Sequence, residues 1–102
     1  IEGNAFSQSR VAQVTIPQSV KEIGSHAFDG CEQLKEVIFQ EGSRLEKVCS
    51  YSFYRCVSLN NIELPRSTQS IGEGCFGGSG LNAFTFPEAV ISLEAYPLYN
   101  CK

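Results

Sequence analysis

Between residues 23 and 34 the chain reads Ile23-Gly24-Ser25-His26-Ala27-Phe28-Asp29-Gly30-Cys31-Glu32-Gln33-Leu34, and this stretch decides the fold. Its apolar residue Ile23 is followed five positions later by Phe28, and the small residue Ala27 stands directly before that ring. The same spacing recurs at Ile1 and Phe6, Val48 and Phe53, Ile71 and Phe76, and Leu93 and Leu98. The starts lie 22, 25, 23 and 22 residues apart, so the sequence is an internal repeat.

The second half of each unit carries the pattern apolar-x-x-apolar-x-apolar. It occurs as Val11/Val14/Ile16, Leu34/Val37/Phe39, Leu59/Ile62/Leu64 and Leu81/Phe84/Phe86. A proline follows three of these four runs, and the second unit has two extra residues within 40–44 instead. Length differences that fall in connecting turns are typical of stacked repeats. We therefore divide the single domain into units 1–22, 23–47, 48–70 and 71–92 and a partial unit 93–102.

Each unit predicts two short strands and one tight turn. Alternation predicts strands at Val14–Ile16, Val37–Phe39, Ile62–Leu64 and Phe84–Phe86, each with two side chains inward and one outward. A second extended stretch is expected at 20–24, followed by one helical or 3₁₀ turn at 27–31. Because one unit cannot enclose its own apolar face, the units must stack. One interior column then contains Phe6, Phe28, Phe53, Phe76 and Leu98.

The composition argues against several classes of partner. Of the 102 residues, 42% are hydrophobic and 19% are charged, which suits a folded core and is too little charge for disorder. The net charge is −3 and the basic residues are not clustered, which argues against nucleic acid as a partner. No apolar run approaches the ~18 residues of a membrane span, so we expect no membrane insertion.

Both ends of the chain fall within the repeat pattern. The first unit opens at Ile1 with nothing ahead of it to cover Val11, Val14 and Ile16, and the last unit stops before its strand. A repeat stack needs terminal units with polar outer faces. We therefore expect that the chain is part of a longer protein, or that its exposed end units associate end to end with another copy.

The unit resembles the repeat of the BspA-type leucine-rich-repeat family, which runs I-G-x-x-A-F-x-x-C-x-x-L-x-x-[VI]-x-[IL]-P-x-S-[VL]. The likeness is carried by residues 23–34, by Ile16-Pro17-Gln18-Ser19-Val20 and by Ile71-Gly72-Glu73-Gly74-Cys75-Phe76. The departures are Cys49 in place of glycine, Cys75 in place of alanine, and a degenerate final unit. The resemblance implies an α/β fold, a right-handed and strand-rich leucine-rich-repeat solenoid of about 4.5 units with short parallel strands and short helical or 3₁₀ turns. It also implies a cell-surface or secreted module for adhesion and protein binding.

The five cysteines suggest packing rather than chemistry. Cys31, Cys56 and Cys101 share one position in the repeat, so we expect them to be free thiols in one inward column. One disulfide between Cys31 and Cys56 remains the alternative, because adjacent units lie ~4.8 Å apart. The spacing contains no Cys-x-x-Cys or His-x-x-x-His pair, so it supports no zinc site, and we expect no metal and no cofactor.

Catalytic patterns are also missing from the sequence. His26 is the only histidine and falls at an expected surface turn, with no candidate triad around it. The glycine-rich stretch 72–80 lacks the Gly-Lys-Ser/Thr of a phosphate-binding loop, and its glycines suit turns. We predict no catalytic residues and no enzymatic activity.

The outward strand positions are the best candidates for ligand binding. Units ~4.8 Å apart would align them as a continuous strip of roughly 14 Å. The strip consists of Gln13, Thr15, Glu36, Ile38, Asn61, Glu63, Ala83 and Thr85. Ile38 is its informative member, because an outward isoleucine is either a strand-forming choice or a contact residue. The alternative site is a tyrosine edge formed by Tyr51, Tyr54, Tyr96 and Tyr99.

Two functions are compatible with this sequence. The first is a non-catalytic adhesion module that presents the strand face to a protein partner, such as a host or extracellular-matrix protein. The second is a structural spacer in a larger surface protein whose binding is done elsewhere. The outward residues are chemically mixed, which favours the binding module over the spacer.

Overall fold

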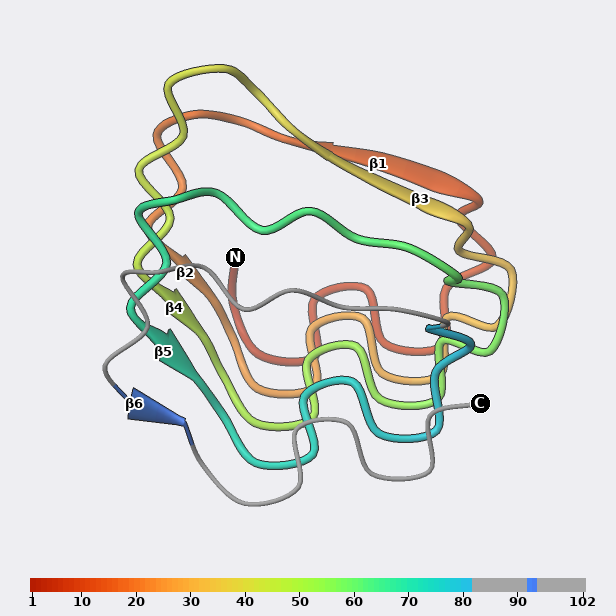
Figure 1. Ribbon diagram of the computed structural model, residues 1–102. Helices are drawn as coiled ribbons and strands as arrows, with labels where there is room; N and C mark the ends of the chain where they lie inside the picture. Colours follow the sequence, from red (N-terminus) through yellow and green to blue (C-terminus); the bar gives the residue numbers. More distant parts are fainter. Residues whose placement is uncertain (82–91, 94–102) are drawn as a thin grey trace.

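The computed structural model describes residues 1–81 and 92–93 of the chain. Repeated loops of chain lie one above another, with strands on two flanks (Figure 1). One flank holds a two-stranded sheet of β1 (Gln13–Ile16) and β3 (Glu36–Phe39). The other holds a four-stranded sheet in the order β2 (Glu22–Ile23), β4 (Lys47–Val48), β5 (Ser70–Ile71) and β6 (Ser92–Leu93).

Every strand pairs in parallel with its equivalent in a neighbouring unit. Ile23 lies opposite Val48, Val48 opposite Ile71, and Ile71 opposite Leu93. On the other flank Val14 lies opposite Val37. The apolar positions that repeat in the sequence are therefore the positions that meet in space, as stacking requires.

The turns after β2, β4 and β5 are not helical, which corrects the expected helical or 3₁₀ turn at 27–31. Alternate amides close short turns within the unit, as in the bond from the Ala27 N–H to the Gly24 oxygen (3.1 Å). The amides between them cross to the next unit, as in the bond from the Phe28 N–H to the Ser52 oxygen (2.7 Å). Residues 1–81 and 92–93 contain no helix, so the helical part of the predicted α/β class is wrong and the fold is strand-rich.

Left-handed backbone at two positions in each of the first four units produces this alternation. The first position is occupied by Asn4, His26, Tyr51 and Gly74, with φ of 61°, 59°, 57° and 59°. The second is occupied by Gln8, Gly30, Arg55 and Gly78, with φ of 59°, 74°, 61° and 69°. Non-glycine residues seldom adopt this conformation, at a cost of about 1–2 kcal/mol each. The stack keeps it because the geometry aligns amides with the carbonyls of the next unit.

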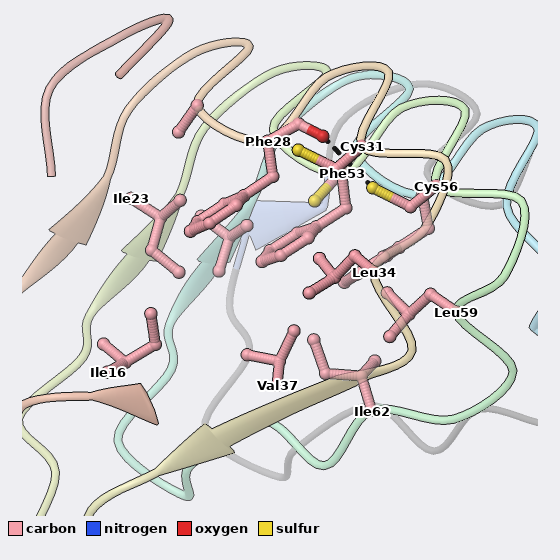
Figure 2. Packing of buried hydrophobic residues seen from close by; sticks show 14 of the residues in the cluster. Ile16, Ile23, Phe28, Cys31, Leu34, Val37, Phe53, Cys56, Leu59 and Ile62 are labelled. Atoms are coloured by element: carbon pink, nitrogen blue, oxygen red, sulfur yellow. Dashed lines mark hydrogen bonds between the residues drawn. The ribbon is translucent and has the colours of Figure 1, made fainter. Parts of the chain in front are cut away.

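Stacked phenylalanine rings fill the centre of the core. The ring centroids of Phe6 and Phe28 are 5.2 Å apart, those of Phe28 and Phe53 are 5.1 Å apart, and those of Phe53 and Phe76 are 5.6 Å apart. Phe28, Phe53 and Phe76 are fully buried, which confirms their predicted place, whereas Phe6 at the first unit is 43% exposed. Figure 2 shows further equivalent pairs side by side, among them Leu34 with Leu59.

The strand expected at Ile62–Leu64 does not form. Residues 60–64 have no regular secondary structure, so β3 pairs with β1 alone. The segment begins with Asn60 and Asn61, and asparagine is depleted in strands because it competes for backbone hydrogen bonds. Ile62 nevertheless points inward and is 5% exposed. The fourth expected strand, Phe84–Phe86, lies outside the described residues.

Candidate functional site

The first two units present the predicted strip as a strand ladder. Gln13 lies opposite Glu36 and Thr15 lies opposite Ile38, and all four residues are exposed. Ile38 is 38% exposed, which leaves an apolar side chain at the centre of a polar face. Asn61 and Glu63 are also exposed, but they belong to the segment without strand structure. Ala83 and Thr85 lie outside the described residues.

A groove interrupts the strip where continuity was expected. Its volume is about 300 Å³, and it lies between β3 and the third unit, lined by Glu36, Val37, Ile38, Phe39, Asn61, Ile62 and Glu63. Val37 and Ile62 are buried and lie near one another in Figure 2, so they form an apolar floor. The exposed residues Glu36, Ile38, Asn61 and Glu63 form its rim. The surface is therefore a two-strand ladder beside a groove, because the third strand expected in this strip does not form.

The described half of the tyrosine edge is a packed cluster. Tyr51 and Tyr54 meet edge to face, with ring centroids 5.3 Å apart. Tyr51 also stacks on His26 at 5.2 Å, and its hydroxyl donates to Glu73 at 3.4 Å. The negative charge of Glu73 raises the pKa of the Tyr51 hydroxyl. Tyr96 and Tyr99, the other members of this predicted edge, lie outside the described residues.

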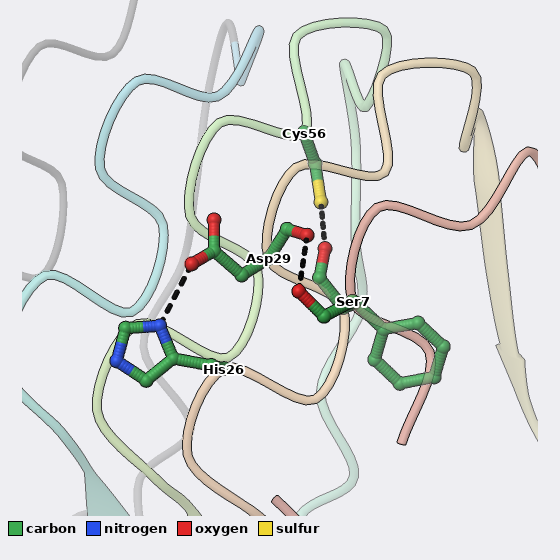
Figure 3. Close-up of polar contacts among 5 residues, drawn as sticks. Ser7, His26, Asp29 and Cys56 are labelled. Carbon is green, nitrogen blue, oxygen red and sulfur yellow. Dashed lines mark hydrogen bonds and ion pairs between the residues drawn. The ribbon is translucent and has the colours of Figure 1, made fainter. Parts of the chain in front are cut away.

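His26 has a partner that the sequence alone did not reveal. Its Nδ1 lies 2.7 Å from Asp29 Oδ2, three residues further along the same turn (Figure 3). The spacing of the two residues was visible in the sequence, but only the turn geometry brings their side chains together. The pair braces a left-handed residue against its own turn, and the Ser7 hydroxyl donates to the Asp29 backbone oxygen at 3.4 Å.

The four described cysteines carry free thiols. Two of them link adjacent units, because Cys31 Sγ donates to the Phe6 oxygen at 3.0 Å and Cys56 Sγ donates to the Phe28 oxygen at 3.1 Å. Burial raises the pKa of Cys31 and Cys56, and it raises the pKa of Cys75 to about 12. Thiols held protonated in this way are poor nucleophiles. Cys101 lies outside the described residues.

A second, mostly polar hollow lies beside the turns and was not anticipated. Its volume is about 510 Å³, and its lining residues come from the turns of three successive units: Gln8, Ser9, Arg10, Asp29, Gly30, Glu32, Gln33, Tyr54 and Arg55. The signal in the sequence was the placement of charged and amide side chains at the end of the first two turns, as Gln8 and Arg10 and as Glu32 and Gln33. Its acidic and basic groups are mixed, so it selects no one charge.

The part of the chain that the structure describes offers neither a metal-binding cluster nor a membrane-spanning helix. There, no cluster of three or more His, Cys, Asp or Glu side chains could hold a metal ion. Across the same residues, no helix is long and apolar enough to cross a bilayer.

Comparison with known proteins places this geometry in a family. The BspA type leucine rich repeat region matches residues 1–102 in six copies, which confirms the resemblance found in the sequence. A search of curated proteins found no match to the chain.

Solved structures of bacterial proteins, among them two leucine-rich-repeat proteins, superpose on the chain. The T. pallidum leucine rich repeat protein (TpLRR) has a TM-score of 0.93 and 34% identity over 99% of this chain and 47% of its own. A leucine-rich repeat protein from Bacteroides ovatus ATCC 8483 has a TM-score of 0.86 and 29% identity over 96% of this chain and 26% of its own. The pneumococcal vaccine antigen PcpA has a TM-score of 0.68 and 30% identity over 78% of this chain and 20% of its own. The chain thus spans half or less of the length of these proteins, and it belongs to the BspA-type leucine-rich-repeat family.

Proposed function

We propose that the chain is a non-catalytic protein-binding module that presents the outward face of β1 and β3, together with Asn61 and Glu63, to a protein partner. Proteins built from such repeats are generally interaction or surface proteins and typically non-catalytic. The observation that carries the proposal is Ile38, an isoleucine 38% exposed and bordered by polar side chains. Apolar anchors within a polar rim are the usual arrangement of binding hot spots.

The lengths and the nature of the matched proteins bear on the setting of the module. We propose that it belongs to a longer cell-surface or secreted protein, in which units 1–22, 23–47, 48–70, 71–92 and 93–102 form one right-handed stretch of solenoid. Two observations support this setting: the matched proteins are longer than the chain, and one of them is a vaccine antigen. Adhesion to a host or extracellular-matrix protein follows as the specific role.

The test is capture of extracellular-matrix and host-cell proteins on the immobilised chain, followed by binding measurements with two variants. Ile38→Lys and Glu63→Lys are expected to weaken the captured interaction at least tenfold without changing thermal stability. Val57→Lys is the matched control, because Val57 is 54% exposed but lies outside the strip. If both strip variants bind like the parent, the strand face is not the site.

The alternative function is a structural spacer. Under that reading Ile38 is only a strand-forming residue, and no partner would be captured. The tyrosine edge is the alternative site if a partner is captured and the strip variants leave its affinity unchanged. In that case Tyr54→Ala is the variant that should weaken binding.

A further inference from the structure

The strand β3 has one paired edge and one open edge. The Glu36 N–H bonds to the Ala12 oxygen at 3.4 Å, and the Gln40 N–H bonds to the Ile16 oxygen at 3.1 Å. The even-numbered residues therefore direct their backbone groups toward β1. In a parallel ladder, alternate residues direct theirs to the opposite neighbour. The backbone groups of Val37 and Phe39 consequently face the third unit, where residues 60–64 form no ladder with them.

The open edge borders the groove rather than solvent alone. Val37 and Phe39 both line it, as do Asn61, Ile62 and Glu63 on the far side. Its volume of about 300 Å³ is at the lower end of the range for ligand sites. It runs along the four residues of β3, so it offers unpaired backbone donors and acceptors over one short strand length. An unpaired strand edge is a template for a further strand.

The charges of the groove restrict what can enter it. Glu36 and Glu63 supply two carboxylates at its rim, and none of its lining residues is Lys or Arg. Ile38 provides an apolar contact between them. An incoming strand would alternate its side chains between the solvent face, beside the two carboxylates, and the floor, above Val37 and Ile62. The outward positions therefore favour Lys or Arg, and the inward positions favour small residues.

We propose that this groove binds an extended, cationic peptide segment of the protein partner as an added strand beside β3. The proposal rests on the proposed function, since it names the chemistry that the strand face would recognise. Strand addition obtains its affinity from main-chain hydrogen bonds and its selectivity from alternate side chains. Here those two contributions come from the edge of Val37 and Phe39 and from the carboxylates of Glu36 and Glu63.

The test uses a synthetic peptide as the probe, namely acetylated and amidated Lys-Ala-Lys-Ala-Lys-Ala, with the whole chain as receptor. Binding is expected to slow hydrogen exchange of the Val37 and Phe39 amides at least tenfold, while those of Glu36 and Ile38 change little. Methylation of alternate peptide nitrogens should abolish binding, because it removes the donors of the new ladder. A Glu-Ala peptide of the same length should not bind.

Charge variants separate strand addition from adsorption of a cation. Glu63→Lys is expected to weaken the Lys-Ala peptide at least tenfold, and raising the salt concentration should reduce its affinity. Glu41→Lys is the matched control, because Glu41 is exposed in the same half of the molecule but does not line the groove. The proposal is overturned if the N-methylated peptide binds equally well, or if saturating peptide leaves the Val37 and Phe39 amides unprotected.

Failure of this proposal is distinguishable from failure of the proposed function. The peptide assay needs no natural partner, so its result stands whether or not one is captured. A captured partner that is sensitive to Ile38→Lys, combined with an unprotected β3 edge, would keep the binding face and refute strand addition. If the peptide adds as a strand but no partner is captured, the groove proposal is supported and the proposed protein-binding function is refuted.

Discussion

The two flanks of the molecule differ in how continuously the strands of neighbouring units pair. On one flank, strands of two residues pair without interruption from β2 to β6. On the other, the longer strands β1 and β3 pair once, and the ladder then opens into a groove. Strand length therefore does not decide continuity.

Residue type at the repeated position explains the difference better. The continuous flank has the β-branched, fully buried residues Ile23, Val48 and Ile71 at one position. Glycines follow two of them, and a Cβ at Gly72 would lie 2.5 Å from the Ser50 nitrogen, so the backbones there approach very closely. The interrupted flank instead meets Asn60 and Asn61 in its third unit. One asparagine-rich segment is enough to release a strand edge.

The aromatic column, which both flanks enclose, should give the largest effect. Phe53→Ala is expected to lower the free energy of unfolding by about 3–5 kcal/mol, because it leaves a cavity between two stacked rings. Phe6→Ala should cost much less, since that ring is already 43% exposed. Urea unfolding of both variants measures the contrast, and equal losses would show that the first unit is packed as tightly as the centre.

Close backbone approach on the continuous flank should give the next-largest effect on the free energy of unfolding. Gly72→Ala is expected to destabilise the fold by about 1–3 kcal/mol, because the added methyl group must displace the backbone of the preceding unit. Gly3→Ala serves as the control, with its nearest neighbour, the Ser25 oxygen, at 3.1 Å. A Gly72→Ala protein as stable as the Gly3→Ala protein would contradict this explanation of continuity.

Alkaline pH should weaken the core that joins the two flanks. Because burial raises the pKa of the Cys75 thiol from 9.0 to about 12, only the unfolded chain loses this proton between those values. Stability from this thiol is therefore complete below about pH 9 and declines as the pH rises toward 12, by on the order of 1 kcal/mol per pH unit. Cys75→Ala should flatten the decline, and an unchanged slope in denaturant titrations from pH 8.5 to 10.5 would refute this assignment.

A substitution at the corner between the flanks should change the stability by a smaller amount, in this case an increase. Thr68 is fully buried, its hydroxyl has no hydrogen-bond partner, and the equivalent residue in the second unit is Leu45. Thr68→Val keeps the shape and removes the unpaired group, so we expect about 1 kcal/mol of added stability. Thermal unfolding checks this, with Thr15→Val on the exposed face as the control. A lower melting temperature for Thr68→Val would mean that the hydroxyl is satisfied.

The smallest change in stability is expected from restoring strand propensity on the interrupted flank. Asn61→Val is expected to add no more than about 0.5 kcal/mol, because it improves strand propensity at an exposed position. Its sharper readout is hydrogen exchange at Val37 and Phe39, which should slow as the ladder extends across the groove. Faster or unchanged exchange would show that residue type at this position does not cause the interruption.

The sequence predicted burial well because apolar spacing reports burial directly. The period, the column of Phe28, Phe53 and Phe76 and the inward position of Ile62 all followed from it. The turn conformation was harder to predict. Tyr51 and Arg55 adopt left-handed backbone, which a sequence indicates only where the residue is glycine. There the hydrogen bonds to the next unit override the local preference of the residue.

The exposure of the candidate residues was predictable, but the shape of the surface that they form was not. Alternation correctly made Glu36, Ile38 and Glu63 outward and exposed. The groove between them depends on whether two neighbouring backbones come within hydrogen-bonding distance, which side-chain periodicity does not encode. The pairing of His26 with Asp29 likewise needed the turn geometry.

The bonds that cross from turn to turn have a mechanical consequence. The Phe6 amide is bonded to Ala27, the Phe28 amide to Ser52 and the Phe53 amide to Cys75, so each such bond joins one unit only to the next. A force applied at the first residue would therefore load the bonds of the first unit before those of the second. The molecule would unzip in steps, and each step would release one turn of chain and one ring of the stack. Such stepwise lengthening would let a tethered molecule absorb a pull while the remaining units stay folded.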